Sequence, residues 1–193
     1  MKTMNSLSDQ QLISLYVEGN PDALATVVER HKDKIFTSIY LLVKDKFLAE
    51  DLFQDCFVKA IDKLNSGVYN EEGKFLPWMI RMAHNLCIDY FRKVKRSPSI
   101  KTSDNEDIFD SFDFSVSGVD DRIIQGQTYE RVKKMLDLIP EDQKEVIVMR
   151  HFANLSFKEI SNITGTSINT SLGRMRYGLM NLRKLMAEKQ IAL

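Results

Sequence analysis

The C-terminal quarter of the sequence carries side chains whose types and spacing suit contact with DNA. Thr170, Arg174 and Tyr177 recur every three or four residues, so a helix would place them on one face. An arginine at such a position can pair with both acceptors on a guanine edge, which discriminates between bases by about 1–3 kcal/mol. Arg176 and Lys184 suit phosphates, which fix register and not sequence. The alternative is a basic face that meets only solvent.

A second group of such side chains falls between residues 77 and 96. One helical face there would carry four polar residues: Arg81, Asn85, Arg92 and Arg96. Aromatic residues are interleaved with them: Trp78, Tyr90 and Phe91. Aromatic faces beside a cationic groove bind single-stranded nucleic acid by stacking, and the polar loop 65–73 could receive a base pulled out of its stack. Ordinary core packing of the aromatic residues is the alternative.

A third group is acidic and polar. Asp51, Gln54 and Asp55 lie off the apolar stripe of a predicted helix over residues 47–64. Negative side chains that share a face can steer the approach of a basic protein partner. The pattern therefore indicates either a protein-binding surface or a solvated helix face.

Helices must position all three groups, and nearly every segment of the sequence predicts one. Capping boxes begin helices at Ser8 and Ser156, and Asn20-Pro21 suits the start of another. Apolar residues at helical spacing predict helices over 47–64, 77–96 and 141–152, and no alternating strand pattern of useful length occurs. The fold class is therefore all-α.

The same spacing predicts which faces pack inward. The inward residues of the 77–96 helix are predicted to be Trp78, Met79, Met82, Ala83, Leu86, Cys87, Tyr90, Phe91 and Val94. Ser167 caps a final helix, whose inward residues are predicted to be Ile168, Leu172, Met175, Leu179, Leu182 and Met186. Thr170, Arg174, Tyr177, Asn181 and Lys184 are predicted to face outward. A capped helix, the turn Thr164-Gly165 and this last helix give the layout of a helix-turn-helix, whose second helix enters the major groove.

Charge divides the chain into three segments. The predicted domains are 1–96 and 121–193, joined by a flexible acidic linker over 97–120. Residues 1–96 carry a net charge of +1, residues 97–125 of −5, and residues 126–193 of +4. The whole chain has no net charge, so it gains little from counterion release and should bind DNA weakly by itself. Phe109, Phe112 and Phe114 in the linker suit packing onto a domain or docking on a partner.

Several classes of protein are not supported by the sequence. No apolar run is long enough for a transmembrane helix, and residues 1–9 do not read as a signal peptide. The two cysteines, Cys56 and Cys87, fit buried thiols in a reducing compartment, which predicts a cytoplasmic protein. No phosphate loop, metal-ligand spacing or nucleophile–base pair is present, so no catalytic residue, metal or cofactor is expected and the protein is not expected to be an enzyme.

Two stretches resemble a known family. Residues 49–57 followed by 78–92 look like region 2 of the sigma-70 family of RNA polymerase sigma factors. Residues 138–143, continuing through the helix-turn-helix, look like region 4. With only these two regions and a short linker, the chain resembles the extracytoplasmic-function group. The resemblance covers about residues 8–96 and 121–186.

The resemblance implies a role for each matched position. Asp51, Gln54 and Asp55 would bind the clamp of core RNA polymerase. Asn85, with Arg81 and Arg92, would open the −10 element of a promoter and read it as a single strand, with loop 65–73 capturing a flipped base. The final helix would read the −35 element as duplex through Thr170, Ser171, Arg174 and Arg176, joined by the outward Tyr177. The linker would thread through the polymerase, and an anti-sigma factor is an expected partner.

One position departs from the family pattern. Gly173 stands where a basic residue would be expected before the arginine, and a glycine costs a helix roughly 1 kcal/mol relative to alanine. Arg174 is therefore the firmest candidate for base contact. A repressor or activator that uses only the helix-turn-helix, and a helical signalling adaptor, remain as alternatives; the first leaves the region 2 motifs unexplained.

Overall fold

The computed structural model describes residues 4–67, 69, 73–96 and 134–188, and every regular element in these ranges is helical. The first module contains a short 3-10 helix and four α-helices: η1 (Met4–Ser6), α1 (Asp9–Val17), α2 (Pro21–Val43), α3 (Lys46–Asn65) and α4 (Phe75–Arg96). The second contains α6 (Glu141–Ile147), the π-helix η2 (Val148–Phe152), α7 (Phe157–Thr164) and α8 (Ile168–Glu188). The all-helical prediction is confirmed. The predicted linker 97–120 and its phenylalanines lie outside the described residues.

Local caps set where the N-terminal helices begin. The Ser8 hydroxyl accepts the Gln11 backbone N–H at 3.3 Å, and the Gln11 side chain accepts the Ser8 backbone N–H at 2.9 Å. Asn20 caps α2 by accepting from Asp22 N–H at 3.1 Å, with Pro21 at the first helical position. Both predicted starts are confirmed.

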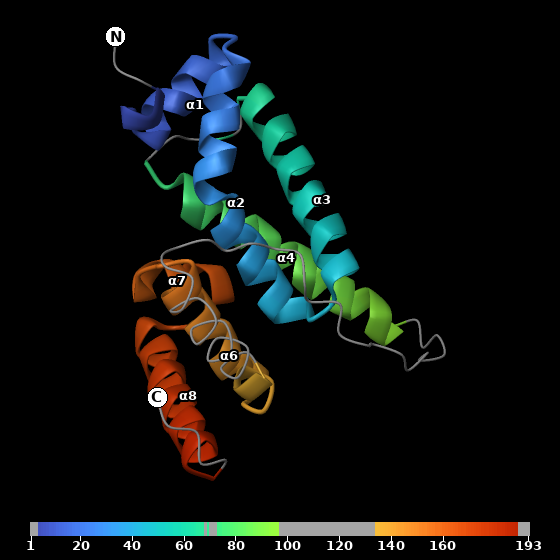
Figure 1. Ribbon diagram of the computed structural model, residues 1–193, viewed down its shortest axis with the longest axis vertical. Coiled ribbons are helices and arrows are strands. Elements are labelled where there is room, and N and C mark those ends of the chain that lie inside the picture. The colour runs from blue at the N-terminus through green and yellow to red at the C-terminus, as the bar shows by residue number, and fades with distance from the viewer. Residues whose placement is uncertain (1–3, 68, 70–72, 97–133, 189–193) are drawn as a thin grey trace, which may run out of the picture.

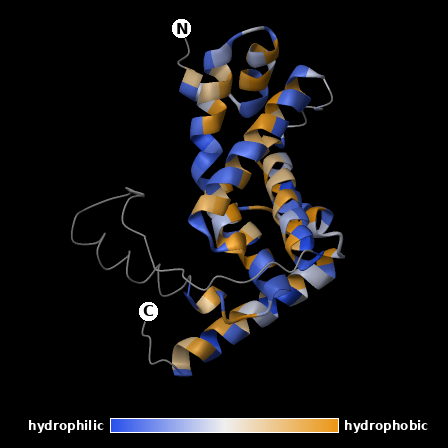
Figure 2. Ribbon diagram, turned by 90° about the vertical axis from the view of Figure 1, so that its right-hand side faces the viewer, coloured by the Kyte–Doolittle hydropathy of each residue, from blue (hydrophilic) through white to orange (hydrophobic). Residues whose placement is uncertain are grey.

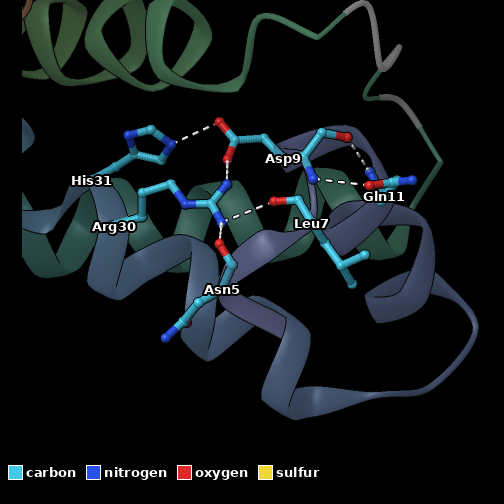
Figure 3. A network of polar contacts seen from close by, with 7 residues as sticks. Asn5, Leu7, Asp9, Gln11, Arg30 and His31 are labelled. Carbon is cyan, nitrogen blue, oxygen red and sulfur yellow. Dashed lines mark hydrogen bonds and ion pairs between the residues drawn. The ribbon is translucent and has the colours of Figure 1, made fainter. Parts of the chain in front are cut away.

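A polar network fastens the N-terminal segment to α2 (Figure 3). The Asp9 carboxylate binds the Arg30 guanidinium at 2.5 Å and His31 Nε2 at 2.7 Å. Arg30 also donates to the backbone carbonyls of Leu7 at 2.9 Å and Asn5 at 3.3 Å. Because one guanidinium satisfies three acceptors, the chain before α1 is held against the middle of α2.

The core of the first module lies between α2, α3 and α4. The apolar stripe predicted on α3 is confirmed, with Leu52, Cys56, Ala60 and Leu64 buried. On α4 the prediction holds as far as Cys87 and fails beyond it, because Phe91 is 43% exposed and Val94 49% exposed. The last turns of α4 project past the neighbouring helices, so no partner covers that end (Figure 1).

The two modules pack against each other. Val146, Met149 and Ile160 of the second module belong to the same buried cluster as the core of the first, and η2 lies against α2. Hydrophobic and hydrophilic residues are mixed along each helix (Figure 2). Within the described ranges, no helix is both long enough and apolar enough to cross a membrane.

Candidate nucleic-acid interface

The polar face of α4 is open to solvent. Arg81, Asn85 and Arg92 are all exposed, at the spacing that places them on one side of the helix. The Arg92 guanidinium lies 3.4 Å from the Asp89 carboxylate, but both side chains are about two-thirds exposed. Such an exposed pair holds the arginine only weakly, so the three side chains remain available to a ligand.

Aromatic rings gather at the start of α4. The Tyr69 and Trp78 ring centroids lie 4.4 Å apart, and Phe75 lies 5.8 Å from Trp78. Phe75 is buried and Trp78 half-buried, so the corner is partly core and partly surface. Helix α4 starts at Phe75 and not at Pro77 as predicted, because Pro77 stands in the first turn, where a backbone N–H has no partner within the helix.

The acidic face of α3 is also free of internal partners. Asp51, Gln54 and Asp55 are exposed, and no ion pair engages either aspartate within the part of the chain that the structure describes. In Figure 1, α3 lies on the side of the first module away from α6 and α8. A negative surface of this kind suits a basic protein partner.

The second module has the predicted helix-turn-helix. Ser156 accepts from Glu159 N–H at 3.3 Å, while the Glu159 carboxylate accepts from Ser156 N–H at 2.8 Å. Helix α7 ends at Gly165, whose φ of +66° is left-handed and favours glycine. Ser167 caps α8 by accepting from Thr170 N–H at 3.0 Å. The capping box, the turn and the cap of the last helix are confirmed.

The predicted inward face of α8 is wrong in part. Ile168, Leu172 and Leu179 are exposed, whereas Ser171 and Gly178 are buried. A Cβ on Gly178 would lie 2.7 Å from Ile147 Cδ1, so α6 and α8 approach each other where α8 has no side chain. Close approach of two helices selects small residues at the contact, and an apolar stripe does not reveal this.

Turning α8 in this way changes the surroundings of several predicted contacts. Ser171 has no exposed surface, and its hydroxyl lies 3.2 Å from that of Thr166. Arg174 Nε lies 3.1 Å from Asp142 Oδ2, and Asn181 donates to the Gln143 side chain at 2.8 Å. Arg174 and Asn181 therefore do not face freely outward, contrary to the prediction.

Three other candidates on α8 are accessible. Thr170, Arg176 and Tyr177 are exposed, Tyr177 to 60%. Arg176 lies on a different side of α8 from Thr170 and Tyr177, as helical spacing requires. The structure thus brings Thr170 and Tyr177 together on one face and leaves Arg176 apart from them.

A cavity of about 610 Å³ lies between the modules. Its walls come from α4 on one side and from α6, the turn after α7 and α8 on the other. Residues of the first module that line it include Cys87, Phe91 and Arg92, and those of the second include Thr166 and Arg174. Two of the predicted DNA contacts, Arg92 and Arg174, therefore face the same enclosed space.

Polar pairs cross the contact between modules, and sequence reasoning did not find them. His84 Nε2 of α4 hydrogen-bonds the Glu145 carboxylate of α6. Lys44 Nζ, at the end of α2, lies 2.9 Å from Asp137 Oδ1. Asp137 also accepts from Lys144 Nζ at 3.3 Å, and the Lys144 side chain has no exposed surface. Burial lowers the pKa of Lys144, and the positive charge of Lys44 lowers it further.

The cysteines and metal-binding side chains offer no second site. Burial raises the pKa of both Cys56 and Cys87 to about 12, so both thiols stay protonated at neutral pH. Both are fully buried, as predicted. No group of three or more histidine, cysteine, aspartate or glutamate side chains suits a metal ion in the described part of the chain.

Comparison with known proteins was made by sequence and by fold. Residues 27–97 match the family model described as Sigma-70 region 2, and residues 129–171 match Sigma-70, region 4. The chain is 29% identical over 171 residues to the ECF RNA polymerase sigma factor SigW of Bacillus subtilis, covering 86% of this chain and 90% of the relative. It is 26% identical over 141 residues to SigM of the same organism, covering 73% and 81%.

Two solved structures share the fold. CnrH, in complex with the cytosolic domain of CnrY, matches with a TM-score of 0.67 and 20% identity, covering 93% of this chain and 97% of that one. RpoE of Bartonella quintana, in complex with the anti-sigma factor NepR, matches with a TM-score of 0.64 and 20% identity, covering 85% and 96%. At this identity the likeness concerns the fold alone.

Proposed function

The chain belongs to the sigma-70 family of RNA polymerase sigma factors, in its extracytoplasmic-function group, and on that premise we propose how its modules share the work of promoter recognition. The protein binds core RNA polymerase and directs promoter-specific transcription initiation as a non-catalytic subunit. The finer assignments that follow concern its own residues, and they include action in the cytoplasm, where the family's polymerase works. Residues 1–96 form the region 2 domain, 97–120 the linker and 121–193 the region 4 domain.

The first module opens and reads the −10 element. Asn85, flanked on the same exposed face by Arg81 and Arg92, contacts the single strand. The half-buried Trp78 beside Tyr69 offers a ring at the edge of loop 65–73, where a flipped base would stack. The observation that supports this assignment is the solvent-open polar face of α4 within the segment matched to region 2.

The second module reads the −35 element with α8 in the major groove. Thr170 and Tyr177 are exposed at the N-terminal half of this helix and Arg176 is free to meet a phosphate. Arg174 reads a base edge after exchanging Asp142 for a guanine. Ser171 is assigned a positioning role, because its buried hydroxyl meets Thr166 in the turn before the helix.

Core polymerase docks on the acidic face of α3 through Asp51, Gln54 and Asp55. Their exposure and lack of internal ion pairs support this assignment. The acidic linker, with a net charge of −5 over residues 97–125, threads into a channel of the polymerase built for nucleic acid. An inhibitory protein partner is proposed by analogy with the structural relatives, which were solved with CnrY and with the anti-sigma factor NepR.

The experiment that tests these assignments is co-elution with core RNA polymerase in size-exclusion chromatography. The wild-type protein should co-elute, and a Gln54→Ala, Asp55→Lys variant should not. Glu29→Lys is the control, because Glu29 is exposed on α2 and pairs only with Lys32 on the same helix. Wild-type protein that elutes alone would leave a stand-alone DNA-binding regulator as the better account. A variant that still co-elutes would remove the α3 assignment.

A further inference from the structure

One side chain of the first module completes the core of the second. Leu41 of α2 is only 4% exposed, and its cluster consists otherwise of second-module residues: Leu136, Ile139, Ile147 and Val148. Removing a buried leucine from such a site costs about 2–5 kcal/mol. Leu41 therefore makes a substantial contribution to holding the modules together.

Polar contacts surround this apolar contact. Lys44 lies one turn beyond Leu41 and pairs with Asp137 at 2.9 Å, while His84 bonds Glu145 from the other side of the interface. Both histidine and glutamate are largely buried there. Such pairs discriminate among alternative packings more than they add attraction, so they fix how the second module seats on the first.

This seating covers the end of α8 that meets DNA. The cavity between the modules is about 610 Å³ and is lined by Phe91 and Arg92 of α4 and by Thr164, Thr166 and Arg174 of the helix-turn-helix. That volume is typical of a small-molecule pocket. A DNA duplex, whose major groove alone is about 12 Å wide, does not fit into it. The turn before α8 and Arg174 therefore cannot reach a major groove while α4 stands opposite them.

We propose that the free protein is self-inhibited: Leu41 and the pairs Lys44–Asp137 and His84–Glu145 hold region 4 against region 2, and the modules must separate before α8 reads duplex DNA. The contacts come from the described residues alone, and the masking of α8 rests on its proposed role in reading the −35 element. Core polymerase, by holding the modules apart, supplies the energy of opening. The device needs no inhibitory protein, and such a protein would add to it.

Simple arithmetic gives the size of the effect. A minor open state populated at 0.1–10% reduces apparent affinity in proportion to its population, so full opening tightens binding by about tenfold or more. Replacing Leu41 by a charged residue removes at least the leucine contribution, which shifts the closed-to-open equilibrium by about 30-fold or more. One substitution is therefore enough to move the population.

The first test compares Leu41→Glu with Val17→Glu in the full chain. Val17 is an apolar residue that is 64% exposed on α1, so the same chemical change there leaves the contact between modules intact. Small-angle scattering should show a larger radius of gyration for Leu41→Glu only. Its affinity for a promoter duplex, first recovered from genomic DNA by transcription with the reconstituted polymerase, should rise about tenfold or more. An unchanged radius or an unchanged affinity overturns the proposal.

The second test locks the closed state and so does not depend on a destabilised variant. Lys44→Cys with Asp137→Cys is joined by a cleavable bismaleimide, and Glu29→Cys with Lys32→Cys, an exposed pair within α2, is the matched control. The buried native thiols, with pKa values of about 12, do not compete for the reagent. Promoter-directed transcription should be lost in the locked protein alone and return after cleavage.

The outcomes separate this proposal from the proposed function. A locked protein that transcribes as well as its control shows that closure does not inhibit, and overturns self-inhibition. A wild-type protein that gives no transcript with core polymerase counts against the proposed function, while the scattering comparison still decides whether Leu41 holds the modules closed.

Discussion

Replacing Lys144 by methionine should stabilise the protein, although it removes an ion pair. The Lys144 side chain has no exposed surface, whereas its partner Asp137 is 41% exposed and keeps a second cation, Lys44, at 2.9 Å. Methionine is similarly long and apolar, so it fills the same space without a charge to bury. Because Asp137 stays paired, the substitution leaves no buried charge uncompensated.

The magnitude follows from comparing the two contributions. A Lys144–Asp137 contact of 3.3 Å to a half-exposed carboxylate is worth about 0–1 kcal/mol. Burying an ammonium group costs several times that, and apolar replacements of buried ion pairs gain up to about 4 kcal/mol. We expect the free energy of unfolding to rise by about 1–3 kcal/mol, which raises Tm by about 2–4 °C for each kcal/mol in a chain of this size.

The pH dependence of stability supplies an independent check. Burial lowers the pKa of Lys144 below its ordinary 10.5, so the unfolded chain binds more protons than the folded one between the lowered pKa and 10.5. Stability should therefore rise with pH across that window. The Lys144→Met variant should lose this part of the rise.

Chemical denaturation of the wild type and the variant at several alkaline pH values measures both effects. Lys134→Met is the control, since Lys134 is exposed in the same module. A variant that is less stable than the wild type by more than about 1 kcal/mol, or one that keeps the full alkaline rise, would refute the reasoning.

Three further predictions concern α4, α8 and α7. Asn85→Ala should reduce promoter opening, measured by permanganate reactivity, much more than co-elution with core polymerase; equal losses would contradict the division of roles. Gly178→Val should lower the free energy of unfolding by about 1–3 kcal/mol because its side chain meets Ile147, whereas Gly173→Ala, with open space around it, should raise it by about 0.5–1 kcal/mol; similar denaturation midpoints for the two would argue against the close approach of α6 and α8. Ser156→Ala should cost about 1 kcal/mol through loss of the cap, and a neutral result in the same assay would remove the capping box as a determinant of α7.

Features that depend on neighbouring residues in sequence were predictable. The capping boxes at Ser8 and Ser156 and the left-handed Gly165 were each indicated by a few adjacent residue types, and each is confirmed. The buried stripe of α3 was predictable for the same reason, since this helix packs along its length against its neighbours.

Features that depend on distant residues were not predictable. The rotation of α8 follows from the approach of α6 at Gly178, and apolar periodicity favoured Leu172 and Leu179, which are exposed. His84–Glu145 joins residues 61 positions apart in two modules, so no local pattern announced it. For Arg174, the sequence indicated the residue type suited to base contact but not the carboxylate of Asp142 that holds it.

The insertion of Leu41 into the second module has a practical consequence for dividing the chain. A fragment that begins after the linker would leave Leu136, Ile139, Ile147 and Val148 without the leucine that covers them, and so would offer an apolar patch for self-association. A chimera that joins this region 4 to the region 2 of a relative inherits the same demand. Exchange of modules between relatives should therefore succeed most often when residue 41 and its neighbour at position 44 travel together with the C-terminal half.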